Sequence, residues 1–194
     1  MYISHWLIPV SVLGPGERLC LYVRGCSRGC PGCIAPEFQT KGTDSRSVEE
    51  LGELLNEIIF YEKCDGVTIS GGEPFEQADE LLELCSMLRT DDILVYSGFS
   101  FTELKKAYGE RISKSGIGVL ITEPYIEEQN DDLPLRGSSN QEIIFLKEEL
   151  RARYESYLTT SKRKIQKFVN ENGETFFSGI PEKKSRKCFV MLSE

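Results

Sequence analysis

The sequence predicts an α/β protein whose parallel strands form a partial (β/α) barrel that is open at one side. Short segments rich in β-branched residues alternate with longer segments whose apolar residues follow the helical period. Glycine-rich turns follow two of the expected strands directly, at Gly25 and at Gly71. About four or five strands are expected, which is too few to close a barrel of eight.

The first half of the chain contains two expected strands with a helix between them. Residues 19–24 are mostly apolar and predict the first core strand, which leads into a cysteine-rich loop. Ser47 and Glu50 have the spacing of a capping box, in which each side chain binds the other residue's backbone N–H. The apolar stripe that follows predicts a helix over residues 48–59, and residues 66–70 predict the second strand.

The middle of the chain continues the alternation. Residues 81–88 predict a helix, residues 93–96 a strand and residues 117–122 another strand. Between these two strands, a capping box at residues 100–103 opens a short helix that Gly109 is expected to end. Right-handed crossovers place the ends of parallel strands at one edge of the sheet. Three segments are therefore expected to converge there in one ligand site: those of Cys26, Gly71 and Ser97.

The last third of the chain has a weaker pattern. Residues 123–139 are polar and predict a long loop of the kind that is usually functional or disordered. Residues 142–158 are helix-like, although residues 143–146 are also compatible with a strand. Residues 165–177 predict a hairpin with a type I′ turn at Asn172 and Gly173. One domain is expected over residues 1–194, with a core at roughly 8–150 and a small C-terminal extension at 151–194.

Composition limits the partners and the compartment. The chain carries 31 acidic and 23 basic residues, a formal charge of −8, which disfavours binding to nucleic acid. No apolar run reaches the roughly 18 residues that span a bilayer, and the N-terminus does not resemble a signal peptide. Seven cysteines cannot all pair, and free thiols suit the reducing cytoplasm. Two basic stretches, at residues 162–164 and 183–187, are interpreted as a solvated face or as a docking surface for an acidic protein.

Three cysteines, Cys26, Cys30 and Cys33, lie in one short loop with the spacing C-x3-C-x2-C. Three thiolates in such a loop can hold an iron–sulfur cluster and leave one iron open, which favours catalysis over simple electron transfer. A structural zinc site, with Cys20, Cys64 or His5 as the fourth ligand, is one alternative, and disulfide pairing of these thiols is another. No second C-x2-C pair follows, however, and His5 beside Trp6 is interpreted as structural.

A second motif follows the strand at residues 66–70. Gly71 and Gly72 allow the backbone to approach a ligand closely, Glu73 can hold an ammonium group, and Pro74 fixes the turn. An ordinary strand-to-helix turn is the alternative interpretation of this segment. Its position downstream of the cysteine loop favours a ligand site.

Together the two motifs resemble the radical S-adenosylmethionine superfamily, which implies a 4Fe-4S cluster and S-adenosylmethionine as cofactors. By resemblance, Cys26, Cys30 and Cys33 are both the metal ligands and the catalytic centre. The methionine end of S-adenosylmethionine binds the fourth iron, and the Gly-Gly-Glu motif contacts its amino group. The residue before the third cysteine is often aromatic in this superfamily, but here it is Gly32, which leaves only a backbone contact.

Further segments resemble the activating enzymes of anaerobic ribonucleotide reductase. They are residues 14–18, 24–26, 96–99, 136–141 and 179–181. The likeness departs at residues 121–125, where Thr122 and Glu123 replace the family's Asp and Gly and leave the substrate open. The expected cofactor contacts are Gly32, Ser70, Gly71, Gly72, Glu73, Tyr96, Ser97, Arg136, Ser138 and Asn140. For residues 136–141, a helix cap at Ser138 or Ser139 is the alternative interpretation.

The resemblance implies reductive cleavage of S-adenosylmethionine to a 5′-deoxyadenosyl radical, which takes a hydrogen atom from the substrate. The expected substrate is a protein, the glycine loop of anaerobic ribonucleotide reductase, and the expected electron donor is a flavodoxin. Modification of another peptide or of a small heterocycle is the second hypothesis. A non-catalytic zinc-binding interaction module is the third.

Overall fold

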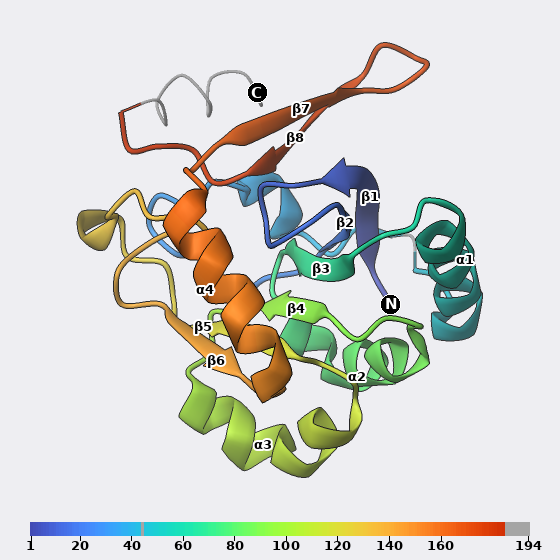
Figure 1. The fold of residues 1–194 in the computed structure, drawn as a ribbon. Coiled ribbons are helices and arrows are strands. Elements are labelled where there is room, and N and C mark those ends of the chain that lie inside the picture. The colour runs from blue at the N-terminus through green and yellow to red at the C-terminus, as the bar shows by residue number, and fades with distance from the viewer. Residues whose placement is uncertain (44, 185–194) are drawn as a thin grey trace.

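In the computed structural model, which describes residues 1–43 and 45–184, a six-stranded sheet has the order β1-β2-β3-β4-β5-β6 (Figure 1). The four central strands are parallel, as the sequence predicts: β2 (Arg18–Val23), β3 (Gly66–Gly71), β4 (Ile93–Tyr96) and β5 (Val119–Thr122). The outer strands β1 (Ile3–Val10) and β6 (Glu142–Phe145) are antiparallel to their neighbours. The α/β class with a mostly parallel sheet is therefore confirmed.

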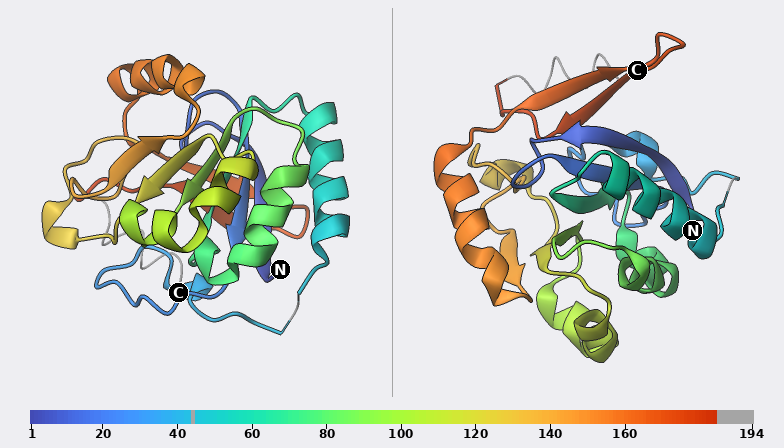
Figure 2. Two further views of the ribbon diagram at one scale, coloured as in Figure 1. Left: turned by 90° about the horizontal axis from the view of Figure 1, so that it is seen from below. Right: turned by 45° about the vertical axis from the view of Figure 1, so that its right-hand side comes forward.

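Three helices cover one face of the sheet, as the views in Figure 2 show. They are α1 (Val48–Tyr61), α2 (Ala78–Met87) and α3 (Phe101–Lys114). The other face packs against α4 (Arg151–Thr160) and a hairpin of β7 (Ile165–Val169) and β8 (Thr175–Gly179). Short 3-10 helices occupy the loops: η1 (Pro36–Phe38), η2 (Pro74–Gln77), η3 (Glu127–Gln129) and η4 (Glu148–Leu150).

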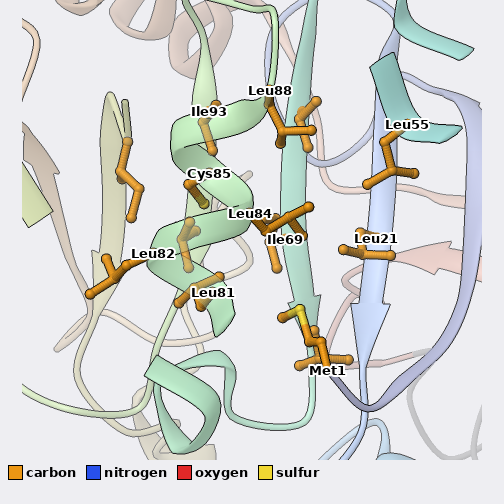
Figure 3. Close-up of a cluster of buried hydrophobic side chains, with 14 of the residues drawn as sticks. Met1, Leu21, Leu55, Ile69, Leu81, Leu82, Leu84, Cys85, Leu88 and Ile93 are labelled. Carbon is orange, nitrogen blue, oxygen red and sulfur yellow. The ribbon is translucent and has the colours of Figure 1, made fainter. Parts of the chain in front are cut away.

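The main core lies between the sheet and α1–α3. Leu21 and Ile69 on the central strands are fully buried against Leu55 of α1 and Leu84 of α2 (Figure 3). This arrangement follows from the sequence, because alternate strand residues point to this face and the helical stripes supply the opposing layer. Burying such side chains contributes about 1.5–3 kcal/mol each. These packed side chains hold the parallel strands, and therefore their carboxyl ends, in place.

A buried charged network lies at the amino end of the strands. The Arg18 guanidinium is fully buried and binds both carboxylate oxygens of Asp92, at 2.9 and 3.1 Å. It also donates to the Thr68 hydroxyl at 2.7 Å, and the Tyr154 hydroxyl donates to Asp92 at 2.6 Å. The network ties β2, β3 and the start of β4 to α4 at the end of the sheet opposite to the cysteine loop.

Several local predictions need correction. The third helix continues through Gly109 to Lys114, because a glycine inside a helix weakens it without ending it. Ser47 accepts from the Glu50 N–H, but its hydroxyl binds Glu49, so only half of that capping box forms. The box at residues 100–103 forms completely. Residues 142–145 form strand β6, which confirms the alternative interpretation for that segment.

The C-terminal hairpin forms, but not with a type I′ turn. Such a turn needs a positive φ at both central residues, and only Gly173 of the expected pair has one, at 81°. The Gly173 N–H instead binds the Asn170 carbonyl at 3.0 Å, which closes a longer loop. Strand β1 was not expected, because Ser4, His5 and Pro9 interrupt its apolar pattern. A proline is tolerated there because β1 is an edge strand.

Candidate functional site

The carboxyl ends of β2, β3 and β4 open onto a cavity of about 250 Å³. In-register pairing of Val23 with Gly71, and of Tyr96 with Ile121, brings the strand ends to one level. Nine of the candidate residues line this cavity: Cys26, Cys30, Cys33, Ser70, Gly71, Gly72, Glu73, Tyr96 and Ser97. The predicted convergence of the cysteine loop with the ends of β3 and β4 is therefore present.

The cysteine loop is closed by backbone hydrogen bonds at its base. The N–H groups of Gly25 and Cys26 donate to the carbonyls of Phe38 and Gln39, at 2.8 and 2.9 Å. Within the loop, the Cys33 N–H donates to the Cys30 carbonyl at 3.0 Å. All three thiols are free and half-buried, and burial raises the pKa of the Cys26 thiol. Binding to iron requires the thiolate, so the metal itself must offset this effect.

The three thiols offer the donor atoms that an iron–sulfur cluster needs. Among the described residues, no three His, Cys, Asp or Glu side chains are arranged to hold one metal ion. Cluster ligands stand farther apart than the ligands of one ion, because each thiolate binds a different iron. Three free thiols line one cavity, and each could bind a different iron. The donor set is also all sulfur, as iron–sulfur clusters prefer.

The two glycines after β3 bring the second motif against the base of the cysteine loop. The Gly72 N–H binds the Val23 carbonyl and the Glu73 N–H binds the Gly25 carbonyl, both at 2.8 Å. Gly71 has a φ of +105°, and a β-carbon there would lie 2.5 Å from the Val23 oxygen. Glycine is therefore required by both the backbone conformation and the close approach.

Glu73 is a buried carboxylate fixed by three donors. It accepts from the Phe75 N–H at 3.0 Å, the Ser97 hydroxyl at 2.9 Å and the Gly98 N–H at 2.6 Å. Burial raises the pKa of Glu73, while these bonds act in the opposite direction. A carboxylate can accept further bonds, so it can bind a cation that enters the cavity.

Glu76 and Gln77, which follow Glu73, hold the cysteine loop, and no pattern in the sequence indicates this role. The Glu76 carboxylate accepts from both the N–H and the hydroxyl of Ser27, each at 2.6 Å. The Gln77 amide donates to the Arg24 carbonyl at 3.0 Å. The glycine motif and the cysteine loop are thus joined by side chains as well as by backbone.

The loop at residues 136–141 is divided between the cavity and its support. Gly137 and Gln141 line the cavity, whereas Arg136, Ser138 and Asn140 do not. Arg136 pairs with Asp131 at 2.6 Å, the buried Ser138 hydroxyl accepts from the Ile126 N–H, and Asn140 donates to the Pro124 carbonyl. No helix begins at Ser138 or Ser139, so the capping alternative is wrong. Gly32 in the cysteine loop is also outside the lining.

The C-terminal hairpin supplies a wall of the cavity, through Phe177, Gly179, Ile180 and Pro181. Arg163 holds this wall to the loop before β6, donating to the carbonyls of Pro181 at 3.4 Å and Leu133 at 3.1 Å. Its side chain is 2% exposed. The interpretation of residues 162–164 as solvated or docking is therefore wrong for Arg163. The second basic stretch extends into residues 185–194, which lie outside the described part of the chain. Cys188 also lies there.

His5 lies outside the cavity lining. Its ring stacks on Tyr22 with centroids 4.9 Å apart and packs against Phe176 at 4.8 Å. Burial, assisted by the positive charge of Arg24, lowers the pKa of His5 to about 4. A neutral ring among aromatic side chains agrees with the structural role predicted for it.

Comparison with known proteins connects this geometry to a family. Residues 12–144 match the family described as "4Fe-4S single cluster domain". Proteins named anaerobic ribonucleoside-triphosphate reductase-activating protein are similar over most of their length. The one from Escherichia coli (strain K12) is 29% identical over 74% of this chain and 98% of its own. The one from Haemophilus influenzae is 31% identical over 73% of this chain and 96% of its own.

A shorter match reaches a second group of relatives. The pyruvate formate-lyase-activating enzyme of Streptococcus mutans is 31% identical over 43% of this chain and 33% of its own. These matches agree with the cysteine loop and the glycine motif that line one cavity. The chain belongs to the 4Fe-4S single cluster domain family and, within the radical S-adenosylmethionine superfamily, to the group of the anaerobic ribonucleoside-triphosphate reductase-activating proteins.

Proposed function

We propose that this protein is a radical S-adenosylmethionine enzyme that generates a glycyl radical on anaerobic ribonucleotide reductase. It reductively cleaves S-adenosylmethionine and takes a hydrogen atom from a glycine of its partner. The observation that carries the proposal is the shared cavity, in which three free thiols meet the Gly-Gly-Glu motif. The match spans 95% or more of the length of the relatives named anaerobic ribonucleoside-triphosphate reductase-activating protein.

Each part of the cavity has a proposed role. Cys26, Cys30 and Cys33 hold the 4Fe-4S cluster, which supplies the electron for cleavage of the carbon–sulfur bond. Glu73 accepts hydrogen bonds from the ammonium group of S-adenosylmethionine, because its fixed carboxylate lines the cavity. Ser97 orients that carboxylate through its hydroxyl, at 2.9 Å.

The remaining predicted residues act through the walls of the cavity. Ser70, Gly71, Gly72 and Tyr96 contribute lining surface at the ends of β3 and β4. Gly32 does not line the cavity and contributes to it indirectly, by shaping the backbone of the cysteine loop. Arg136, Ser138 and Asn140 shape the loop that carries Gly137 and Gln141, through the hydrogen bonds described above.

We further propose that the sheet is a partial barrel whose open side admits the glycine loop of the partner. Four parallel strands, half of the eight in a closed (β/α) barrel, support this arrangement. Residues 1–194 act as one domain in which 151–194 extend a core of roughly 8–150, since hairpin residues line the same cavity as the cysteine loop. A flavodoxin supplies the electron, and the enzyme works in the cytoplasm. In the described part of the chain no helix has the length and apolarity to cross a bilayer.

A different substrate is the second candidate, and Glu123 favours it. Glu123 lines the cavity at the position where the resembled enzymes have glycine, and its φ of +80° is one that glycine adopts most easily. A side chain retained in a strained conformation at a ligand site points to a functional role. A carboxylate there would suit a substrate that carries hydroxyl or cationic groups.

Production of 5′-deoxyadenosine tests the enzymatic proposal. Protein reconstituted anaerobically with iron and sulfide is mixed with dithionite and S-adenosylmethionine, and the nucleoside is measured by chromatography. Wild-type protein should form it and Cys30→Ala should not. Cys64→Ala is the matched control, because Cys64 is half-buried outside the cavity lining. Well-loaded wild-type protein that forms no 5′-deoxyadenosine would overturn the proposal.

A glycyl radical tests the choice of partner. Adding an anaerobic ribonucleotide reductase to the same mixture should produce the electron paramagnetic resonance signal of a glycyl radical. If 5′-deoxyadenosine forms but no reductase acquires that signal, the chemistry stands and the second candidate substrate class replaces the first.

A further inference from the structure

Arg28 places one positive charge in the wall of the cavity. It lies in the cysteine loop between Cys26 and Cys30, and its guanidinium lies over the Phe99 ring, 4.7 Å from the centroid. Among the described residues that line the cavity, Arg28 is the sole lysine or arginine, beside three glutamates. An anionic group that enters this cavity therefore has one cationic partner there.

The Arg28 side chain also has unused hydrogen-bonding capacity. Its Nε atom is buried and has no hydrogen-bond partner within the described part of the chain. A buried donor without a partner costs about 1–3 kcal/mol, so native proteins rarely retain one without a reason. A ligand oxygen would satisfy it once the side chain turned toward the cavity that it lines.

Arg28 and Glu73 flank the same point in space. The position that a β-carbon on Gly98 would take lies 2.6 Å from the Arg28 Nε and 3.4 Å from the Glu73 Oε2. Arg28 is also one of the charges that act to lower the pKa of Glu73, against the larger effect of burial. Arg28 and Glu73 are therefore neighbours, and their charges complement the carboxylate and the ammonium of an amino acid, which are separated by one carbon.

We infer that Arg28 binds the carboxylate at the methionine end of S-adenosylmethionine, while Glu73 binds the ammonium group. This assignment rests on the proposed function. Arginine suits the role because its planar fork matches a carboxylate. A carboxylate has about four lone-pair sites on two oxygens, so binding to Arg28 is compatible with coordination of the same group to iron.

Binding measurements with two ligands test the assignment. Decarboxylated S-adenosylmethionine retains the ammonium, sulfonium and nucleoside and lacks the carboxylate. Dissociation constants for both ligands are measured by equilibrium dialysis on the oxidised, cluster-loaded protein, at matched iron content. Arg28→Gln should raise the dissociation constant for S-adenosylmethionine about tenfold or more, as expected for a charge-assisted hydrogen bond. For the decarboxylated ligand the change should be smaller than twofold, since the carboxylate is already absent.

Lys41→Gln is the matched control. Lys41 also lies beside the cysteine loop, next to Gly25, but it does not line the cavity. The Lys41→Gln substitution removes the same charge as Arg28→Gln. It should leave both dissociation constants within about twofold, as expected for an exposed charge. Arg28→Lys retains the charge without the fork and should show an intermediate loss for S-adenosylmethionine alone. It also tests the assignment if Arg28→Gln does not hold a cluster.

The outcomes separate this assignment from the proposed function. Wild-type protein that binds no S-adenosylmethionine contradicts the proposed function. Wild-type protein that binds it, with Arg28 variants that bind it equally well or that lose both ligands equally, overturns only the role of Arg28.

Discussion

The pKa of His5 gives a quantitative test of how the aromatic cluster on the sheet is packed. His5 is the single histidine of the chain, so its titration can be observed without overlap. Its Nε2 is buried without a hydrogen-bond partner in the described residues, and the ring stacks on Tyr22. Burial first, and then the charge of Arg24, lower the pKa of His5 from 6.5 to about 4. The ring should therefore be neutral at pH 7 and at pH 5.

The magnitude follows from linkage. In the unfolded chain His5 takes up a proton as the pH falls through 6.5, whereas in the folded protein it does so only near 4. The stability that the neutral ring contributes is therefore present above pH 6.5 and is lost as the pH falls toward 4. Between pH 7.5 and pH 5 the full shift corresponds to ~2 kcal/mol. Because the ring is only partly buried, solvent screening reduces the expected loss to about 1–2 kcal/mol.

Two measurements on wild-type protein and His5→Gln check this value. In the proton nuclear magnetic resonance spectrum, the His5 ring signal should titrate well below pH 6. In urea unfolding, the stability difference between pH 7.5 and pH 5 should be larger for wild type by the stated amount, because glutamine does not titrate. Comparing the two proteins cancels the titration of the carboxylates. A ring that titrates near 6.5, or equal pH dependence of both proteins, would refute the packing argument.

Three further predictions concern the scaffold and the site. Arg18→Leu leaves the Asp92 carboxylate buried without its partner and should lower the free energy of unfolding in urea by about 3–5 kcal/mol; a loss below about 1 kcal/mol, typical of an exposed pair, would contradict the burial of this network. Gly72→Ala brings a β-carbon against a carbonyl at the base of the cysteine loop and should lower the iron content after reconstitution. An unchanged iron content would show that the Gly-Gly-Glu motif does not pack against that loop. Glu76→Gln keeps one acceptor for the Ser27 hydroxyl and N–H but loses the charge, so cluster loading should fall about two- to tenfold, as expected for weakened charge-assisted bonds; unchanged loading would show that the cysteine loop holds its shape without Glu76.

The parallel core was predictable because its signals are local and agree with one another. Strand β3 reads as a β-branched run that ends in two glycines, and α1 has an apolar stripe of the right period. The edge strand β1 was not predictable, since its polar residues are accommodated by contacts with the distant hairpin. His5, for example, packs against Phe176. Such long-range contacts leave no periodic signal in the sequence.

The site shows the same division. The two motifs were predictable because their cysteines and glycines have few other uses at that spacing. The supporting contacts were not, because Glu76 and Arg163 are ordinary charged residues until the fold gives them partners. Arg28 also belongs to this group, because its importance depends on being the one cationic side chain in the described lining of the cavity.

Mössbauer spectroscopy tests the central claim most directly, namely that three thiolates hold a cluster with one iron open to S-adenosylmethionine. Protein reconstituted with ⁵⁷Fe is measured before and after S-adenosylmethionine is added. We expect one of the four irons to acquire a distinct spectrum when the cosubstrate binds, while the other three remain unchanged. Four irons that do not respond to S-adenosylmethionine, or one tightly bound zinc in place of the cluster, would contradict the account.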